Sequence, residues 1–149
     1  MQPSQHKNTD AESLDLATFY VRGSAYGIDL LKIQEINKLL ILTPVPGAPS
    51  YVRGILNLRG QIVTVIDLGY KLGLPETIVD AKGRNIIVRS RGEHIGLLVE
   101  QISEVIRVNI DEVEAPPANM NGIEGSFFHG VIKTDDRLIG ILDIEKVLD

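Results

Sequence analysis

The stretch GILNLRGQIVTVIDL, residues 54–68, has the sequence pattern of a β-hairpin. Two arms of aliphatic and β-branched residues flank a central Arg59-Gly60 pair, where the chain is expected to reverse direction. Glycine suits such a turn because it adopts a positive φ without a steric penalty. Arginine has no such advantage, so a long cation at the tip of an apolar hairpin calls for another explanation. Arg59 is therefore a candidate contact residue.

The rest of the chain continues the same pattern. From Leu14 onward, short apolar runs are interrupted by Gly, Pro and Asp at intervals of about 8–12 residues, which is typical of an all-β barrel or sandwich. The chain has 149 residues, 44% of them hydrophobic but only 5% aromatic, so its core must consist mainly of Ile, Leu and Val. We expect one domain over residues 14–149, preceded by a polar, disordered tail over residues 1–13.

The expected elements are short. The strands are predicted at Leu16–Val21, Tyr26–Leu31, the two arms within Ile55–Ile66, Asn85–Arg89, Ile95–Val99, Phe127–Lys133 and Arg137–Asp143, with helices at Asp67–Leu72 and Ile144–Leu148. A turn is expected at Gly23-Ser24. The segment KIQEINK, residues 32–38, fits either one helical turn or a bent strand. The segment EAPPANMNGIEG, residues 114–125, is expected to be one long loop.

An internal repeat runs through these elements. Gly54-Ile55-Leu56 matches Gly130-Val131-Ile132 at a separation of 76 residues, and residues 27–36 match residues 96–105 at a separation of 69. The two separations differ by 7, which predicts an insertion in the second copy, most simply in the 114–125 loop. Two copies of one small β-barrel, each too small to bury a core comfortably alone, would explain the repeat.

The two copies differ at the tip of the hairpin. Where the first copy has Leu58-Arg59-Gly60, the second has Thr134-Asp135-Asp136, which are ordinary turn residues. This asymmetry predicts that the first tip faces a partner.

Composition excludes several classes of function. The net charge of -5 argues against nucleic acid or an anionic membrane surface as the main partner, and no apolar run is long enough for a membrane span. The chain has no cysteine, so disulfides, thiol catalysis and thiolate metal sites are excluded. The N-terminal segment lacks the apolar core of a secretion signal. His6, His94 and His129 are not at metal-ligand spacing, so we expect no metal and no cofactor.

The sequence also offers little for catalysis. Asp67 in VIDLG is similar to the aspartate of the Asp-x-Gly loop of aspartic proteases, but Leu68 stands where that loop needs a hydroxyl. Both Asp67 and Asp143 are better explained as helix N-caps. The alternative that stays open is a small β-barrel enzyme or ligand-binding domain that uses Asp67 or the 114–125 loop.

Two stretches resemble the CheW family of chemotaxis adaptors. They are TFYVRGSAYGIDLLKIQEI, residues 18–36, and PGAPSYVRGILNLRGQIVTVIDL, residues 46–68, and the resemblance extends from about Leu16 to Leu148. It implies a fold of two intertwined five-stranded SH3-like barrels. It also implies a non-catalytic cytoplasmic adaptor that couples the histidine kinase CheA to methyl-accepting chemoreceptors in membrane-bound arrays. The resemblance implies that, in such arrays, the adaptor binds the regulatory domain of CheA, which is itself CheW-like.

The resemblance further implies that the receptor's helical hairpin docks in the groove between the barrels. The residues that match the family's receptor-binding positions, or lie next to them, are Ile33, Glu35, Arg53, Gly54, Leu58 and Arg59. Gly54 is also explained by a close backbone approach, because it matches Gly130. Two positions depart from the family pattern: Thr64, where the family often has Pro, and Gly69, where it often has a basic residue.

The chain is expected to be a stand-alone CheW-like domain, since it contains no receiver-like segment of the kind that CheV carries. Whether it serves flagellar chemotaxis or another chemosensory pathway, such as pilus motility, stays open.

Overall fold

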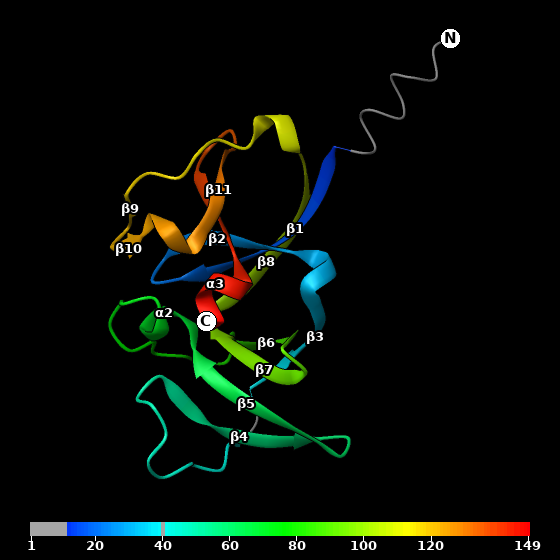
Figure 1. Ribbon diagram of the computed structural model, residues 1–149, viewed down its shortest axis with the longest axis vertical. Helices are drawn as coiled ribbons and strands as arrows, with labels where there is room; N and C mark the ends of the chain where they lie inside the picture. The colour runs from blue at the N-terminus through cyan, green and yellow to red at the C-terminus, as the bar shows by residue number, and fades with distance from the viewer. Residues whose placement is uncertain (1–11, 40) are drawn as a thin grey trace.

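The computed structural model describes residues 12–39 and 41–149, and most of this chain forms two five-stranded sheets (Figure 1). The first sheet has the order β11-β12-β2-β1-β8, and its strands are Phe128–Lys133, Leu138–Leu142, Ser24–Asp29, Ser13–Val21 and Gln101–Asn109. The second has the order β3-β6-β7-β5-β4, and its strands are Ile33–Lys38, Arg84–Ser90, Glu93–Val99, Gln61–Asp67 and Val52–Leu58. In Figure 1 the two sheets lie one above the other, with the C-terminal helix α3 (Ile144–Leu148) between them.

The two sheets exchange strands, so neither is built from one continuous half of the chain. After β2, a 3-10 turn η1 (Leu30–Lys32) leads into β3, which pairs with β6 in the second sheet. After β7, the chain crosses back as β8, which pairs with β1 in the first sheet. The predicted intertwining is therefore confirmed.

The register of the strands confirms the internal repeat. Gly54 lies opposite Val65 in the pair β4·β5, and Gly130 lies opposite Ile141 in the pair β11·β12, so both partners are displaced by the same 76 residues. A register shift precedes each glycine. The pairs β3·β6 and β8·β1 are related in the same way by 69 residues, since Ile33 faces Val88 and Ile102 faces Phe19.

Three apolar clusters hold the sheets. One lies inside the barrel that the first sheet forms (the first barrel), around Leu16 and Ile141. Another lies inside the barrel that the second sheet forms (the second barrel), around Val63 and Leu98. The largest lies between the sheets, and it includes the only fully buried ring pair of the described chain, Phe19 and Tyr26. Because this cluster draws on both sheets, the two barrels form one packed unit.

The helices are capped as predicted. The Asp67 side chain accepts a hydrogen bond from the Tyr70 N–H at the start of α2 (Leu68–Lys71), and Asp143 accepts one from the Lys146 N–H at the start of α3. Gly73, at φ 97°, follows α2.

Several boundaries differ from the sequence-based expectations. KIQEINK forms strand β3 after Lys32 and not a helix, and Leu30-Leu31 belong to η1 and not to the second strand. Strand β8 was not predicted, although it is among the longest, because its exposed polar residues interrupt the alternation of an edge strand. Ser13, which we assigned to the tail, begins β1; residues 1–11 lie outside the described part of the chain.

The 114–125 segment is more ordered than a loop. It contains the short paired strands β9 (Asn119–Met120) and β10 (Ile123–Glu124), and the side chains of Met120 and Ile123 are buried in the central cluster. The 3-10 turns η2 (Ile110–Glu112) and η3 (Gly125–Phe127) flank it. The insertion of the second copy therefore covers the core.

Candidate functional site

The arginine at the tip of the β4–β5 hairpin occupies a turn that the chain uses repeatedly. Arg59 and Gly60 have φ values of 52° and 84°, the positive pair that a type I′ turn requires, and the Gly60 N–H donates to Asn57 Oδ1 at 2.9 Å. Arg22-Gly23 and Arg91-Gly92 turn their hairpins with nearly the same angles. Arginine in this position is thus a recurrent feature of the fold, and Arg59 is distinguished by what its side chain meets.

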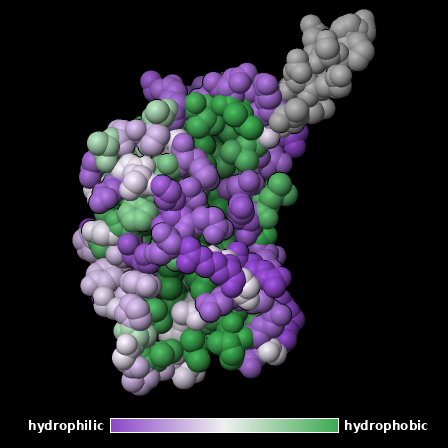
Figure 2. Space-filling model, in the orientation of Figure 1, coloured by the Kyte–Doolittle hydropathy of each residue, from purple (hydrophilic) through white to green (hydrophobic). Residues whose placement is uncertain are grey.

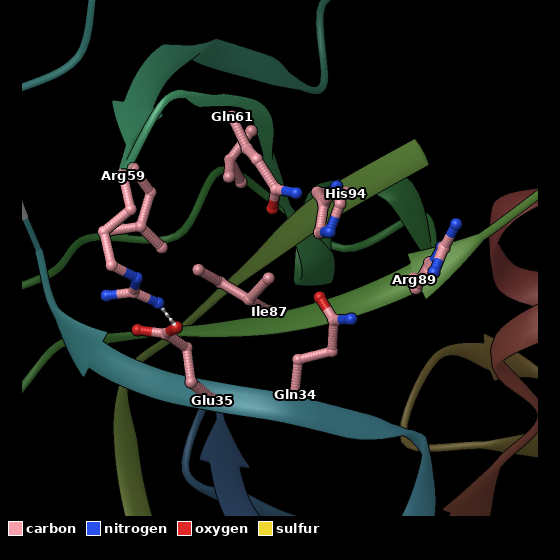
Figure 3. A pocket seen from close by; sticks show the side chains of 9 residues that line it. Gln34, Glu35, Arg59, Gln61, Ile87, Arg89 and His94 are labelled. Atoms are coloured by element: carbon pink, nitrogen blue, oxygen red, sulfur yellow. Dashed lines mark hydrogen bonds and ion pairs between the residues drawn. The ribbon is translucent and has the colours of Figure 1, made fainter. Parts of the chain in front are cut away.

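The guanidinium of Arg59 reaches from the hairpin to a carboxylate on another strand. Its Nη2 forms an ion pair with Oε1 of Glu35 on β3, and this contact bridges the open side of the second barrel (Figure 3). The Arg59 side chain is 71% exposed and that of Glu35 30% exposed. An exposed pair of this kind adds little to stability, about 0–1 kcal/mol, so both groups remain available to a partner.

Below this ion pair lies a cleft of about 350 Å³. Its lining residues are Gln34, Glu35, Leu58, Arg59, Gln61, Val63, Ile87, Arg89 and His94. Val63 and Ile87 form an apolar floor, each 1% exposed, while Gln34, Gln61, Arg89 and His94 stand around it as polar side chains (Figure 3). We call these nine residues the Glu35–Arg59 cleft. An apolar floor with a charged rim suits a protein partner that brings an aliphatic or aromatic side chain and a polar group together.

Of the four remaining expected site residues, Leu58 lines the cleft, whereas Ile33, Arg53 and Gly54 do not. Leu58 lines the cleft and packs on the interior cluster of the second barrel, so it belongs with Glu35 and Arg59. Ile33 lies two residues before Glu35, where β3 has a register shift, and its side chain packs against the central cluster. The structure places Arg53 and Gly54 near the other end of β4, about 20 Å along the strand from Arg59.

Arg53 is engaged within the protein. Its Nη2 lies 3.0 Å from Oδ2 of Asp67 and 2.6 Å from the carbonyl oxygen of Thr77, and the side chain is 26% exposed. Asp67 also accepts from the Thr77 N–H at 2.8 Å and from the Thr77 hydroxyl at 2.6 Å. Burial of the Asp67 carboxyl raises its pKa, but the hydrogen bonds from Thr77, Tyr70 and Arg53 outweigh burial and hold the pKa below its ordinary value.

Gly54 serves a close backbone contact. At φ 147°, an added Cβ would lie 2.7 Å from the carbonyl oxygen of Thr43 and 2.9 Å from Cβ of Leu42. Thr43 and Ile55 form an isolated antiparallel bridge at this point, so the glycine lets a neighbouring segment lie against β4. This agrees with the close approach that the match to Gly130 suggested.

The catalytic alternative finds no support in these positions. Asp67 is 1% exposed and both of its oxygens accept internal hydrogen bonds, so it has no access to a substrate. The 114–125 segment buries the side chains of Met120 and Ile123 in the core. Within residues 12–39 and 41–149, no three His, Asp or Glu side chains are grouped as metal ligands. His6 lies outside the described residues, His94 lines the cleft, and His129 lies 3.5 Å from Asp143.

Sequence reasoning missed six lining residues of the cleft: Gln34, Gln61, Val63, Ile87, Arg89 and His94. They come from strands that only the sheet brings together, β3, β5, β6 and β7. The one usable signal was local, since Gln61 follows the Arg59-Gly60 turn directly. No helix in the described chain is both long and apolar enough to cross a membrane.

Comparisons with known proteins agree with this architecture. The family model described as the CheW-like domain matches residues 15–149. The chemotaxis protein CheW of Bacillus subtilis is 34% identical over 134 residues, covering 90% of this chain and 86% of that protein. The chemotaxis protein CheW of Treponema pallidum is 33% identical over 140 residues, covering 91% and 82%.

A solved structure shows the same fold. The crystal structure of the scaffolding protein TtCheW from Thermoanaerobacter tengcongensis superimposes with a TM-score of 0.84 at 32% sequence identity, covering 91% of this chain and 88% of that chain. The two five-stranded sheets are thus the SH3-like barrels that the sequence led us to expect. The register repeat, the match over residues 15–149 and this structural agreement together show that the chain belongs to the CheW family of non-catalytic chemotaxis scaffolds.

Proposed function

We propose that this protein couples methyl-accepting chemoreceptors to the histidine kinase CheA, and that the receptor tip binds at the Glu35–Arg59 cleft. The supporting observation is the exposed ion pair between Arg59 and Glu35 above the apolar floor of Val63 and Ile87. A receptor hairpin would insert an apolar side chain against Leu58 and the floor, while its polar groups exchange hydrogen bonds with Arg59. Arg59 is suited to this role because its planar guanidinium can stack and donate several hydrogen bonds at once.

The six receptor-binding residues of the proposal act in two ways. Glu35, Leu58 and Arg59 contact the receptor directly. Ile33, Arg53 and Gly54 act by holding the strands in place: Ile33 fixes β3 on the central cluster, while Arg53 and Gly54 fix the far end of β4. Substitutions in the second group therefore reduce receptor binding together with stability.

The proposal places the protein in the cytoplasm, within receptor arrays at the membrane. There it would bind the CheW-like regulatory domain of CheA through another barrel face and assemble into rings. Individual contacts are expected to be weak, because an array multiplies modest affinities.

The test is co-sedimentation of the protein with a receptor cytoplasmic fragment, with and without CheA. Arg59→Ala should weaken receptor binding by about 1–3 kcal/mol, the range of an interface anchor. Its free energy of unfolding should change by less than about 0.5 kcal/mol, because the side chain is exposed.

Arg22→Ala is the matched control, since Arg22 occupies the same kind of turn at the same φ of 52°. The two substitutions change the backbone preference equally, so only the side-chain contact differs between them. Equal receptor binding by Arg59→Ala and Arg22→Ala would refute the cleft as the receptor site. Full receptor binding without recruitment of CheA would instead refute the coupling role.

A further inference from the structure

A second, mostly apolar groove lies in the first barrel and is not used by the proposed receptor site. It has a volume of about 510 Å³, and its seven apolar lining residues are Leu14, Ile28, Ile110, Val113, Ile141, Leu142 and Ile144. Asp143 and His129 stand at its edge, 3.5 Å apart. Figure 2 shows apolar surface gathered at the end of the molecule where η2 lies in Figure 1.

The internal repeat identifies what fills the corresponding place in the second barrel. By the separations of 76 and 69 residues, Asp143 corresponds to Asp67, His129 to Arg53, Ile141 to Val65 and Leu14 to Gly83. In the second barrel this place is covered by residues 74–83, an irregular segment that leads from α2 into β6.

That covering segment makes two kinds of contact. Thr77 gives its N–H and its hydroxyl to Asp67, at 2.8 and 2.6 Å, and its carbonyl oxygen accepts from Arg53 at 2.6 Å. Val79, two residues later, packs on the interior cluster that contains Val65. A hydroxyl residue followed at the second position by an aliphatic residue is therefore the chemistry that fits this place.

In the first barrel the same acceptors and apolar side chains lack such a cover in the described chain. Asp143 accepts from the Lys146 N–H at 3.3 Å and faces His129, whereas Asp67 receives two donors from Thr77 as well. Ile110 leaves 48% of its surface exposed at the groove. A carboxylate with acceptor capacity beside open apolar surface is complementary to a backbone N–H, a hydroxyl and an aliphatic side chain.

We propose that this groove binds an extended segment of a partner protein, with a Thr or Ser donating its N–H and hydroxyl to Asp143. The carbonyl of that residue accepts from His129, and an aliphatic side chain two residues later fills the space between Leu14, Ile110 and Ile141. The chain's own sequence before β1 is a poorer match. Val79 lies four residues before Gly83, and Gly83 corresponds to Leu14. The residue four positions before Leu14 is Asp10, and its carboxylate does not suit an apolar floor.

The probe is a synthetic peptide with the sequence of residues 74–83, LPETIVDAKG, capped at both ends and titrated into the full-length 15N-labelled protein. We expect chemical shift changes at Ile110, Val113, His129 and Asp143, with a Kd of about 0.1–1 mM, as befits a short peptide. A peptide with valine in place of Thr77 should bind about 5- to 10-fold more weakly, because it lacks the hydroxyl donor.

Protein variants locate the binding. Ile110→Asp should weaken peptide binding at least about 10-fold, because it places a charge on the apolar wall. Val105→Asp is the matched control, since Val105 is 55% exposed on the same stretch of chain but does not line the groove. It should bind the peptide as the unmodified protein does.

Any of four results would overturn the proposal. One is the absence of shift changes at about 5 mM peptide, well above the expected Kd. The second is binding that Ile110→Asp leaves unchanged. The third is a set of shift changes confined to α2, β5 and β6, which would mean exchange with the protein's own segment. The fourth is peptide binding only after deletion of residues 1–11, which would assign the groove to the chain's own N-terminal segment. Receptor co-sedimentation does not depend on this groove, so the two proposals fail independently.

Discussion

The two hairpin tips occupy the same place in the repeat but have opposite charges. In the second barrel Arg59 pairs with Glu35, whereas in the first barrel the corresponding residues are Asp135 and Glu104, which carry the same sign. Both tips border an opening, of about 350 Å³ in the second barrel and about 700 Å³ in the first. The two copies thus share their strand register but differ in surface charge. The register is set by hydrogen bonds between backbone groups, whereas the charge around each opening is set by the side chains.

A second difference lies beside the tips. In the first barrel, Arg137 donates to the Tyr20 hydroxyl at 2.5 Å and lies over its ring at 5.6 Å. The corresponding residues of the second barrel, Gln61 and Arg89, both line the Glu35–Arg59 cleft. The comparison indicates that the two openings serve different contacts, and four predictions test it.

The largest expected effect is at the paired glycines. Gly54→Ala should reduce the free energy of unfolding by about 3 kcal/mol or more, since it adds a strained φ to a clash with the Thr43 carbonyl. Gly130→Ala should cost about 1–3 kcal/mol, because its added Cβ meets the Glu114 carbonyl and Val113 without a positive φ. Urea unfolding measures both. Equal losses would show that the φ of 147° carries no strain.

The next effect contrasts two cations in equivalent positions. Arg53→Ala should destabilise the fold by about 1–3 kcal/mol, because it removes a donor from the buried Asp67; partial exposure of Arg53 keeps the loss below that of a fully buried pair. His129→Ala should cost less than about 0.5 kcal/mol, since its side chain is 59% exposed. Thermal unfolding at neutral pH is the measurement. A loss at His129 as large as at Arg53 would contradict the open state of the first barrel's groove.

Asp67 should also make the free energy of unfolding depend on pH in the acidic range. Its folded pKa is lowered, so its contribution is complete above the unfolded pKa of about 4 and is lost as the pH falls through the folded value. The free energy of unfolding should therefore decline below about pH 4 less steeply in Asp67→Asn than in the unmodified protein. Denaturant titrations at a series of pH values measure the two slopes. Parallel slopes would mean that Thr77 and Arg53 do not stabilise the ionised carboxylate.

The smallest effect on stability is expected at the tip itself. Arg59→Asp copies the charge of Asp135 into the second barrel, and the free energy of unfolding should change by less than about 1 kcal/mol, because Arg59 is exposed and Asp tolerates a positive φ. Receptor binding should nevertheless fall more than in Arg59→Ala, since two carboxylates would then face the partner. A variant that keeps its stability and its receptor binding would show that the charge difference between the tips has no functional role.

Much of the secondary structure could be predicted from local sequence. The β4–β5 hairpin and both helix N-caps follow from apolar alternation, Arg59-Gly60, Asp67 and Asp143, because each depends on contacts within a few residues. The repeat follows from matching short stretches of sequence with one another. Strand β8 could not be recognised in the same way, since it is an edge strand with exposed polar residues. Its match to β3 at a separation of 69 was the signal that could have revealed it.

The site was predicted only in part, for the same physical reason. Arg59 was identifiable because it breaks the pattern of its own hairpin, and the CheW resemblance added Glu35. Arg53 looked equally suited to a partner, yet the structure turns it toward Asp67 and Thr77, which are 14 and 24 residues away in the chain.

The sequence alone therefore determined the strand-rich class, the repeat, the capped helices and the cation at the tip, all of which arise from short-range patterns. The tertiary structure alone decided which cations are available to partners, how five strands assemble the Glu35–Arg59 cleft, and that the groove beside Asp143 lacks a cover among the described residues. Those outcomes depend on which segments the sheets bring together across long separations, and side-chain type does not encode them.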